Sequence, residues 1–173
     1  ASPGDAEDVR LPRRRIIDMV ILKLPDEIEK LRISNLIVAQ ILSELRERVK
    51  PGVTTRELDG YCEELCRNKR VKPAFKGYRG YPFALCTSVN GEVVHGMPSE
   101  RPLVSGDILS LDFGVNYKGF YGDAAITVPV GAVSAEAMRL LAVTEAGLYD
   151  AILQARAGNR LGDVSAAVQE RVE

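Results

Sequence analysis

The sequence predicts an α+β fold in which helices and strands occupy separate parts of the chain. Two long stretches, residues 25–49 and 134–157, carry apolar side chains at helical spacing. The segments that have the composition of strands lie between them, from residue 71 to residue 128. A doubly wound parallel sheet would alternate each strand with a helix, so this grouping favours α+β.

The first predicted helix covers residues 25–49 and is followed by Pro51-Gly52, a pair that ends helices. Thr54 and Glu57 have the spacing of a capping box, so a shorter helix is expected to begin there and to continue to about Asn68. The apolar stripe of the first helix consists of Ile28, Leu31, Ile37, Val38, Ile41, Leu42, Leu45 and Val49.

Strands and a last long helix follow. Ser134 is a good N-cap for the helix predicted to reach about Ala157. The predicted strands are residues 71–75, 83–89, 92–95, 107–116 and 119–128.

Composition narrows the class of protein. The 173 residues suit one domain of common size, and 46% hydrophobic with 27% charged residues is typical of a globular protein. The sequence has no apolar run of transmembrane length and no secretory leader, so we expect a cytoplasmic protein without a membrane partner. Cys62, Cys66 and Cys86 are expected to be reduced thiols. A net charge of −1 gives no reason to expect specific nucleic-acid binding.

Residues 1–18 have the composition of a tail outside the fold, which leaves residues 19–173 as the folded domain. The segment mixes both charge signs and has few periodic apolar positions. Arg13-Arg14-Arg15 could contact an acidic surface such as ribosomal RNA, but a solvated tail is the simpler interpretation.

Asp112 and Asp123 suggest a metal site. They lie on either side of Lys118-Gly119, each within an apolar strand pattern. In a hairpin centred between Tyr117 and Lys118 the two carboxylates would lie directly opposite each other, with Cβ atoms roughly 4.5 to 5.5 Å apart. Like charges so placed need a cation to neutralise them, although both aspartates could instead sit at strand ends facing water.

His95 is the only histidine of the chain. It follows the apolar pair Val93-Val94 and precedes Gly96, so a strand is expected to carry the imidazole to the end of a sheet. A lone histidine is more often a surface or core residue than a catalytic one, and the aspartates are what draw attention to it.

The order of these segments resembles the N-terminal half of a type I methionine aminopeptidase. The segments are Tyr78 to Pro98 (YRGYPFALCTSVNGEVVHGMP), Gly106 to Asp112 (GDILSLD) and Gly122-Asp123. The likeness runs from about Met19 to Glu173 and includes MVILKLPDEIEKLR and KPGVTT. It implies the pita-bread fold, in which two related α+β halves enclose a metal site.

The resemblance assigns roles to particular residues. Asp112 is expected to chelate one metal ion and Asp123 to bridge two, while His95 hydrogen-bonds the substrate near the scissile amide without binding metal. The methionine side chain is expected to contact Phe75, Tyr78, Tyr81 and Cys86, for which ordinary core packing is the alternative.

The activity implied is removal of the N-terminal methionine from nascent proteins. Two divalent ions, of cobalt, manganese, iron or zinc, would activate the attacking water. The substrates would be peptides that begin with methionine, the enzyme could act near the ribosome, and the complete protein is expected to be a monomer.

The family's remaining metal ligands, a histidine and two glutamates, come from its second half. The sequence also contains an internal repeat. Lys50-Pro51-Gly52 follows one long predicted helix, and Arg156-Ala157-Gly158 follows another 106 residues later. The second copy of this unit is expected to be incomplete, which suggests truncation. We therefore expect the chain alone to be inactive. An X-prolyl aminopeptidase or prolidase, and a non-catalytic pita-bread binding module, remain the alternatives.

Overall fold

The computed structural model describes residues 16–17 and 20–173. Most of the predicted tail, residues 1–15 and 18, therefore lies outside the described residues. The described residues of this tail form β1 (Ile16–Ile17), which pairs antiparallel with β2 (Val20–Ile21) just after it. The two short strands form a separate ribbon ahead of the first helix.

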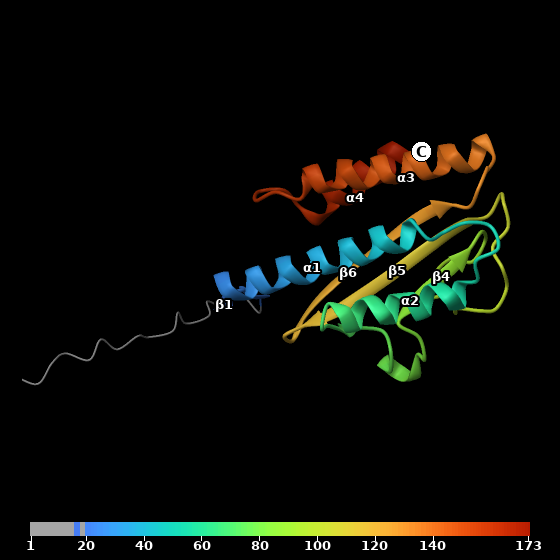
Figure 1. The fold of residues 1–173 in the computed structure, drawn as a ribbon. Helices are drawn as coiled ribbons and strands as arrows, with labels where there is room; N and C mark the ends of the chain where they lie inside the picture. The colour runs from blue at the N-terminus through green and yellow to red at the C-terminus, as the bar shows by residue number, and fades with distance from the viewer. Residues whose placement is uncertain (1–15, 18–19) are drawn as a thin grey trace, which may run out of the picture.

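A four-stranded antiparallel sheet forms the centre of the fold (Figure 1). Its strands are β3 (Lys72–Pro73), β4 (Leu85–Val89), β5 (Ile108–Tyr117) and β6 (Phe120–Pro129). The strand β6 pairs with β5 along the whole length of both strands, so β3 and β4 share the other edge of β5. The prediction of strands here is confirmed, except that residues 92–95 form a loop.

Helices α1 (Pro25–Arg46) and α2 (Thr55–Asn68) cover one face of this sheet (Figure 1). The capping box predicted from Thr54 and Glu57 begins α2. Helix α1 lies over β5 and β6, and α2 lies over β3 and β4. The core between them includes Val38, Ile41, Leu42, Leu45, Leu58, Cys62, Leu85, Leu109, Leu111, Phe113 and Val115.

Alternation along β5 separates the two faces of the sheet. Odd-numbered residues from Leu109 to Val115 are fully buried against the helices. Even-numbered residues point to the opposite face, which we call the site face. Its members are Ser110, Asp112 and Gly114 of β5, Cys86 and Ser88 of β4, and Asp123, Ala125 and Thr127 of β6.

Helices α3 (Ala135–Gln154) and α4 (Leu161–Val172) form a hairpin that stands apart from the sheet and contacts mainly itself (Figure 1). Ser134 caps α3 as predicted. Gly158 turns the chain with φ of 98°, as Gly52 does between α1 and α2 with φ of 91°. The repeated unit of long helix, left-handed glycine and short helix is therefore present twice in the structure.

Candidate metal and substrate site

The β5–β6 hairpin turns at Lys118 and Gly119, which have φ of 51° and 85°. Both central residues have positive φ, as in the tight turns that match the twist of paired strands. Tyr117 therefore pairs with Phe120, and the register is shifted by two residues from the predicted one.

This shift corrects the predicted direct opposition of the two aspartates. Asp112 pairs with Ala125, and Asp123 pairs with Gly114. The two carboxylates are diagonal neighbours on the site face, where separations are roughly 7 to 8 Å between backbones and less between side chains. They are still brought together, because a shift by two residues keeps a side chain on the same face.

The side chains of Asp112 and Asp123 lie close enough to interact directly. Burial raises the pKa of Asp112, and the charge of Asp123 raises it further. Burial also raises the pKa of Asp123. Two neighbouring carboxyl groups whose ionised forms are disfavoured by burial make a donor pair that a divalent cation would stabilise.

The pair alone is an incomplete cation site. Among the residues that the structure describes, no group of three or more His, Cys, Asp or Glu side chains could hold a metal ion. The donors present therefore fit one part of a metal centre.

His95 lies near these carboxylates, and its charge favours the ionised form of Asp112. The predicted strand around it is wrong: residues 93 and 94 lie in a loop, and Val93 is 87% exposed. His95 itself is exposed and has φ of 58°, a conformation that non-glycine residues rarely adopt. A local contact must hold it there.

The four predicted substrate-pocket residues are placed differently from one another. The ring of Phe75 packs over Gly114, where an added Cβ would come within 3.0 Å of it. Cys86 pairs with Asp112 across the ladder and is buried, which raises the pKa of its thiol. Phe75 and Cys86 thus flank the carboxylates.

Two tyrosines complete the predicted set. Tyr81 is half-buried, and its hydroxyl donates to the carbonyls of Leu85 at 3.1 Å and Gly96 at 3.2 Å. Burial raises the pKa of Tyr81. Tyr78 is 64% exposed, and Arg79 lies over its ring. The structure therefore connects Tyr81 to the loop of His95, whereas Tyr78 remains at the surface.

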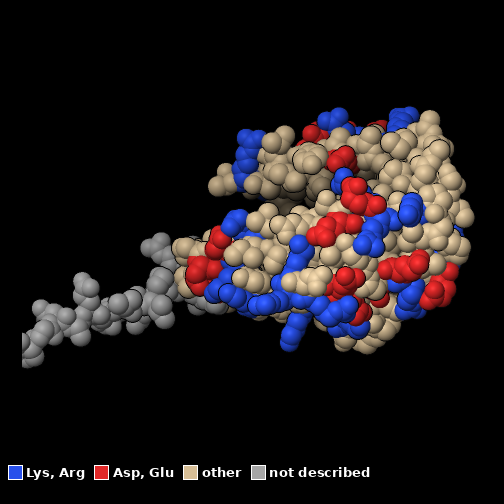
Figure 2. All heavy atoms as spheres, viewed as in Figure 1, with Lys and Arg blue, Asp and Glu red and all other residues tan. Residues whose placement is uncertain are grey.

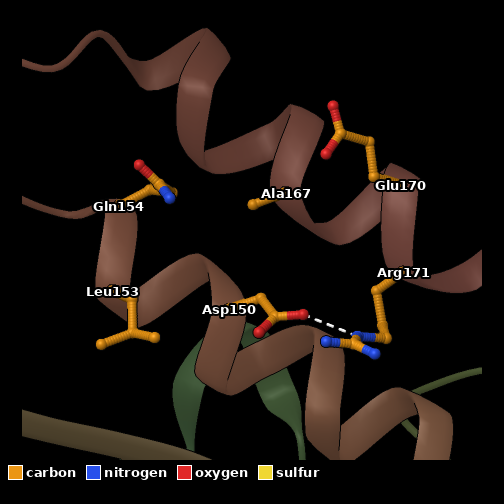
Figure 3. Close-up of a pocket in the computed structure, with 6 residues that line it drawn as sticks. All are labelled: Asp150, Leu153, Gln154, Ala167, Glu170 and Arg171. Carbon is orange, nitrogen blue, oxygen red and sulfur yellow. Dashed lines mark hydrogen bonds and ion pairs between the residues drawn. The ribbon is translucent and has the colours of Figure 1, made fainter.

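A hollow of about 290 Å³ lies between α3 and α4, and Figure 3 shows the side chains that line it. It is spanned by an ion pair of 2.6 Å between Arg171 Nε and Asp150 Oδ2 (Figure 3). None of the predicted site residues lines it. Its lining consists of Asp150, Leu153, Gln154, Ala167, Glu170 and Arg171.

Residues 29–173 match the sequence profile of metallopeptidase family M24. The chain belongs to this family. It is 43% identical over 155 residues to methionine aminopeptidase 1 of Bacillus subtilis, covering 90% of this chain and 62% of that relative. It is 45% identical over 154 residues to the methionine aminopeptidase of Aquifex aeolicus, covering 85% and 60%. The chain thus spans about 60% of the length of these relatives.

Solved structures place this M24 chain in the pita-bread fold. The methionine aminopeptidase of Thermotoga maritima superposes with a TM-score of 0.84 at 46% identity, covering 87% of this chain and 61% of that one. The enzyme from Rickettsia prowazekii gives 0.84 at 34% identity, with 86% and 60% covered. A Xaa-Pro dipeptidase from Bacillus anthracis gives 0.75 at 21% identity, which supports the fold alone.

Residues that support the M24 site escaped the sequence analysis. Gly114 leaves room for Phe75, and Gly122 lets α1 reach β6, since an added Cβ would lie 2.6 Å from the Ser34 carbonyl carbon. The side chain of Asn35 accepts a hydrogen bond from the backbone N–H of Asp123 at 3.4 Å. The glycines inside strand patterns were the one available signal of such close approach.

No helix among the described residues is both long and apolar enough to cross a membrane. Cys62, Cys66 and Cys86 are free, buried thiols.

Proposed function

We propose that the parent protein is a metal-dependent aminopeptidase that removes N-terminal methionine, and that this chain supplies Asp112, Asp123 and His95 to its active site. The observation that carries the proposal is the arrangement of the site face. Two carboxyls of adjacent strands are diagonal neighbours on this face, and the only histidine of the chain lies near enough for its charge to act on Asp112.

In this proposal Asp112 and Asp123 hold two divalent ions, of cobalt, manganese, iron or zinc. Such ions lower the pKa of bound water and polarise the scissile carbonyl. His95 hydrogen-bonds the substrate near the scissile amide and orients it, without binding metal. Its exposed position allows an incoming peptide to reach it.

The methionine side chain would rest against Phe75 and Cys86, which flank the carboxylates. An aromatic ring and a sulfur atom suit a flexible thioether. We assign the ring of Tyr81 to the same wall. Tyr78 would join it only if its exposed ring turned inward on binding.

The substrates we propose are nascent chains that begin with methionine, cleaved by a monomeric parent protein in the cytoplasm. The relatives named methionine aminopeptidase support this choice over X-prolyl cleavage. We also propose that the missing metal donors belong to the part of the relatives that this chain does not match, so that the 173-residue chain alone does not turn over.

Calorimetric titration with manganese and cobalt tests the donor pair. We expect weak binding by the chain, and its loss in an Asp112→Asn, Asp123→Asn double variant. The matched control is Asp26→Asn, Asp150→Asn, which removes two carboxylates outside the sheet and should leave binding unchanged. Equal binding by both double variants would reject Asp112 and Asp123 as ligands.

Methionine release from a Met-Ala-Ser peptide tests the activity. The isolated chain should release none, whereas the full-length parent should do so and lose this activity with Asp112→Asn. Turnover by the isolated chain would show that it completes its own site. Inactivity of the full-length parent on peptides that begin with methionine would reject the proposed function.

A further inference from the structure

The residue after His95 is held against β4 by three hydrogen bonds. The carbonyl of Gly96 accepts from the Thr87 N–H at 2.8 Å and from the Tyr81 hydroxyl at 3.2 Å. The N–H of Gly96 donates to the Ser88 hydroxyl oxygen at 3.1 Å. Both polar groups of this peptide segment are therefore fixed to one strand and to the turn before it.

The contact is too close for any other residue. A Cβ added at Gly96 would lie 2.1 Å from the Thr87 carbonyl oxygen. The backbone at Gly96 thus lies directly against the edge of β4, and His95 is the last side chain before that contact.

His95 needs such support. Its φ of 58° belongs to the left-handed region, which is unfavourable for a residue other than glycine. Backbone strain of this kind persists only where surrounding contacts hold the residue in place. The hydrogen bonds at Gly96 are the contacts closest to it in the chain.

Ser88 connects this contact to the carboxylates. It is 4% exposed and lies on the site face of β4, two residues from Cys86, which pairs with Asp112. One rigid strand therefore carries both the neighbour of Asp112 and the hydroxyl that holds the loop of His95.

We propose that the hydroxyls of Ser88 and Tyr81 are positioning groups that fix His95 beside Asp112. The inference rests on the proposed role of His95. It gives the Tyr81 hydroxyl a role separate from that of its ring, which lines the methionine pocket. Neither hydroxyl touches the substrate in this scheme; both act through the backbone of Gly96.

Ser88→Ala and Tyr81→Phe each remove one hydroxyl and keep the remainder of the side chain. Ser110→Ala is the matched control, because Ser110 pairs with Ser88 on the same face but bonds Thr127 at 2.9 Å and not the loop. Ser88→Thr restores a hydroxyl and should recover the wild-type behaviour.

The first measurement is NMR of the isolated chain without metal. His95 gives the only histidine signals, so its ring mobility can be followed without assignment ambiguity. We expect Ser88→Ala to raise the exchange rate of the Gly96 amide about 2- to 10-fold, the range that follows from losing one ordinary hydrogen bond. The His95 ring should become more mobile in both Ser88→Ala and Tyr81→Phe, and unchanged in Ser110→Ala.

The second measurement is kinetics of the full-length parent. Ser88→Ala and Tyr81→Phe should lower kcat about 10- to 100-fold with KM within about twofold, since misplacing a reacting group costs rate more than binding. Loss of the Tyr81 ring in Tyr81→Ala should raise KM as well.

The NMR result decides the positioning role independently of the proposed activity. A Gly96 amide and a His95 ring that behave alike in Ser88→Ala, Ser110→Ala and the wild type would overturn the inference, even in an active enzyme. Looser His95 dynamics in Ser88→Ala and Tyr81→Phe would support it, even if methionine release were absent.

Discussion

The α1–α2 pair and the α3–α4 pair are built from the same local parts but have different surroundings. Each consists of a long helix, a glycine with positive φ, and a shorter helix whose third residue is an acid bonded back to the cap. Glu57 accepts from the N–H of Thr54, and Asp163 accepts from the N–H of Arg160. Local chemistry is thus sufficient to specify the helix-turn-helix shape in both.

Burial separates the two pairs. The first packs Val38, Ile41, Leu42 and Leu45 of its predicted stripe into the core, although Ile28 of that stripe is 55% exposed. Helix α3 buries only Gly147 and Ala151. Figure 2 shows a hollow between the α3–α4 hairpin and the rest of the molecule. The exposed apolar residues of this hairpin include Met138, Leu140, Leu148, Tyr149, Ile152, Leu153 and Leu161.

Helix formation is specified by neighbouring residues in the sequence, whereas helix packing depends on a surface elsewhere in the fold. Caps and turn glycines act within a few residues. A helix gains stability from packing only where another surface covers its apolar face. Most of the stability of helices in proteins comes from such packing. We expect α3–α4 to open locally at a lower free energy than α1–α2 with its sheet.

Replacing one isoleucine in each pair should give the largest difference. Ile41 is fully buried in α1, and Ile152 of α3 is 55% exposed. Ile41→Ala should lower the free energy of unfolding by about 2 to 5 kcal/mol, and Ile152→Ala by less than about 0.5 kcal/mol. Urea denaturation followed by circular dichroism measures both, and equal losses would mean that α3 is packed as tightly as α1.

The Asp107 carboxylate should make the loop before β5 sensitive to acid in a way that the α3–α4 hairpin is not. Its carboxylate accepts from the Val104 N–H at 3.0 Å and the Asn90 amide at 2.7 Å, and these bonds lower its pKa. A lowered pKa in the folded state contributes stability above the unfolded value of about 3.9, and this stability is lost as pH falls through the folded value.

Asp107→Asn should therefore cost about 1 to 3 kcal/mol at pH 6 and progressively less towards pH 3. Denaturation at several pH values measures the difference. Asp163→Asn removes the charge of the side chain that accepts from the Arg160 N–H at the start of α4, and it serves as the comparison, expected to leave the unfolding of the sheet region unchanged. A pH-independent cost for Asp107→Asn would mean that its carboxylate charge is unimportant.

Substitutions of the two turn glycines, Gly52 and Gly158, test whether the conformational cost of a turn residue lowers the stability of the whole fold or of one helix pair only. Nothing lies within 4 Å of a Cβ added at Gly52 or Gly158, so Ala at either position meets only the cost of its positive φ, roughly 1 to 2 kcal/mol. Gly52→Ala should lower the global free energy of unfolding by that amount. Gly158→Ala should instead speed amide exchange within α3–α4, leaving exchange in β5 unaltered.

Features set by neighbouring residues could be predicted from the sequence. The cap at Ser134, the capping box of Thr54 and Glu57, and both strands of the aspartate hairpin agree with the structure. The hairpin register was wrong by two residues because the turn was centred one residue too early. Gly119 was the available signal, since glycine favours the positive φ that the second turn position requires.

Features set by distant contacts could not be predicted. Val93 and Val94 have strand composition, yet no strand forms at 92–95, because other groups occupy the free edge of β4. The Leu85 N–H donates to Asp59, the Thr87 N–H to the Gly96 carbonyl and the Val89 N–H to the Glu92 carboxylate. The left-handed conformation of His95 depends on the contact of Gly96 with β4, between residues eight or nine positions apart. Pattern alone identified the histidine but not its geometry.

Ion pairs should produce the smallest effect and still distinguish the two helix pairs. Arg171 and Asp150 join α4 to α3, whereas Arg32 and Glu29 join neighbouring turns of α1. Asp150→Asn should speed amide exchange in α4 at low salt, and the difference should disappear at about 1 M salt, where charges are screened within roughly 3 Å. Glu29→Gln should leave exchange in α1 unchanged, because packing on the sheet and not this pair holds α1 in place. If Glu29→Gln loosened α1 as much as Asp150→Asn loosens α4, surface charge would matter equally in both pairs, and burial could not be the reason for their difference.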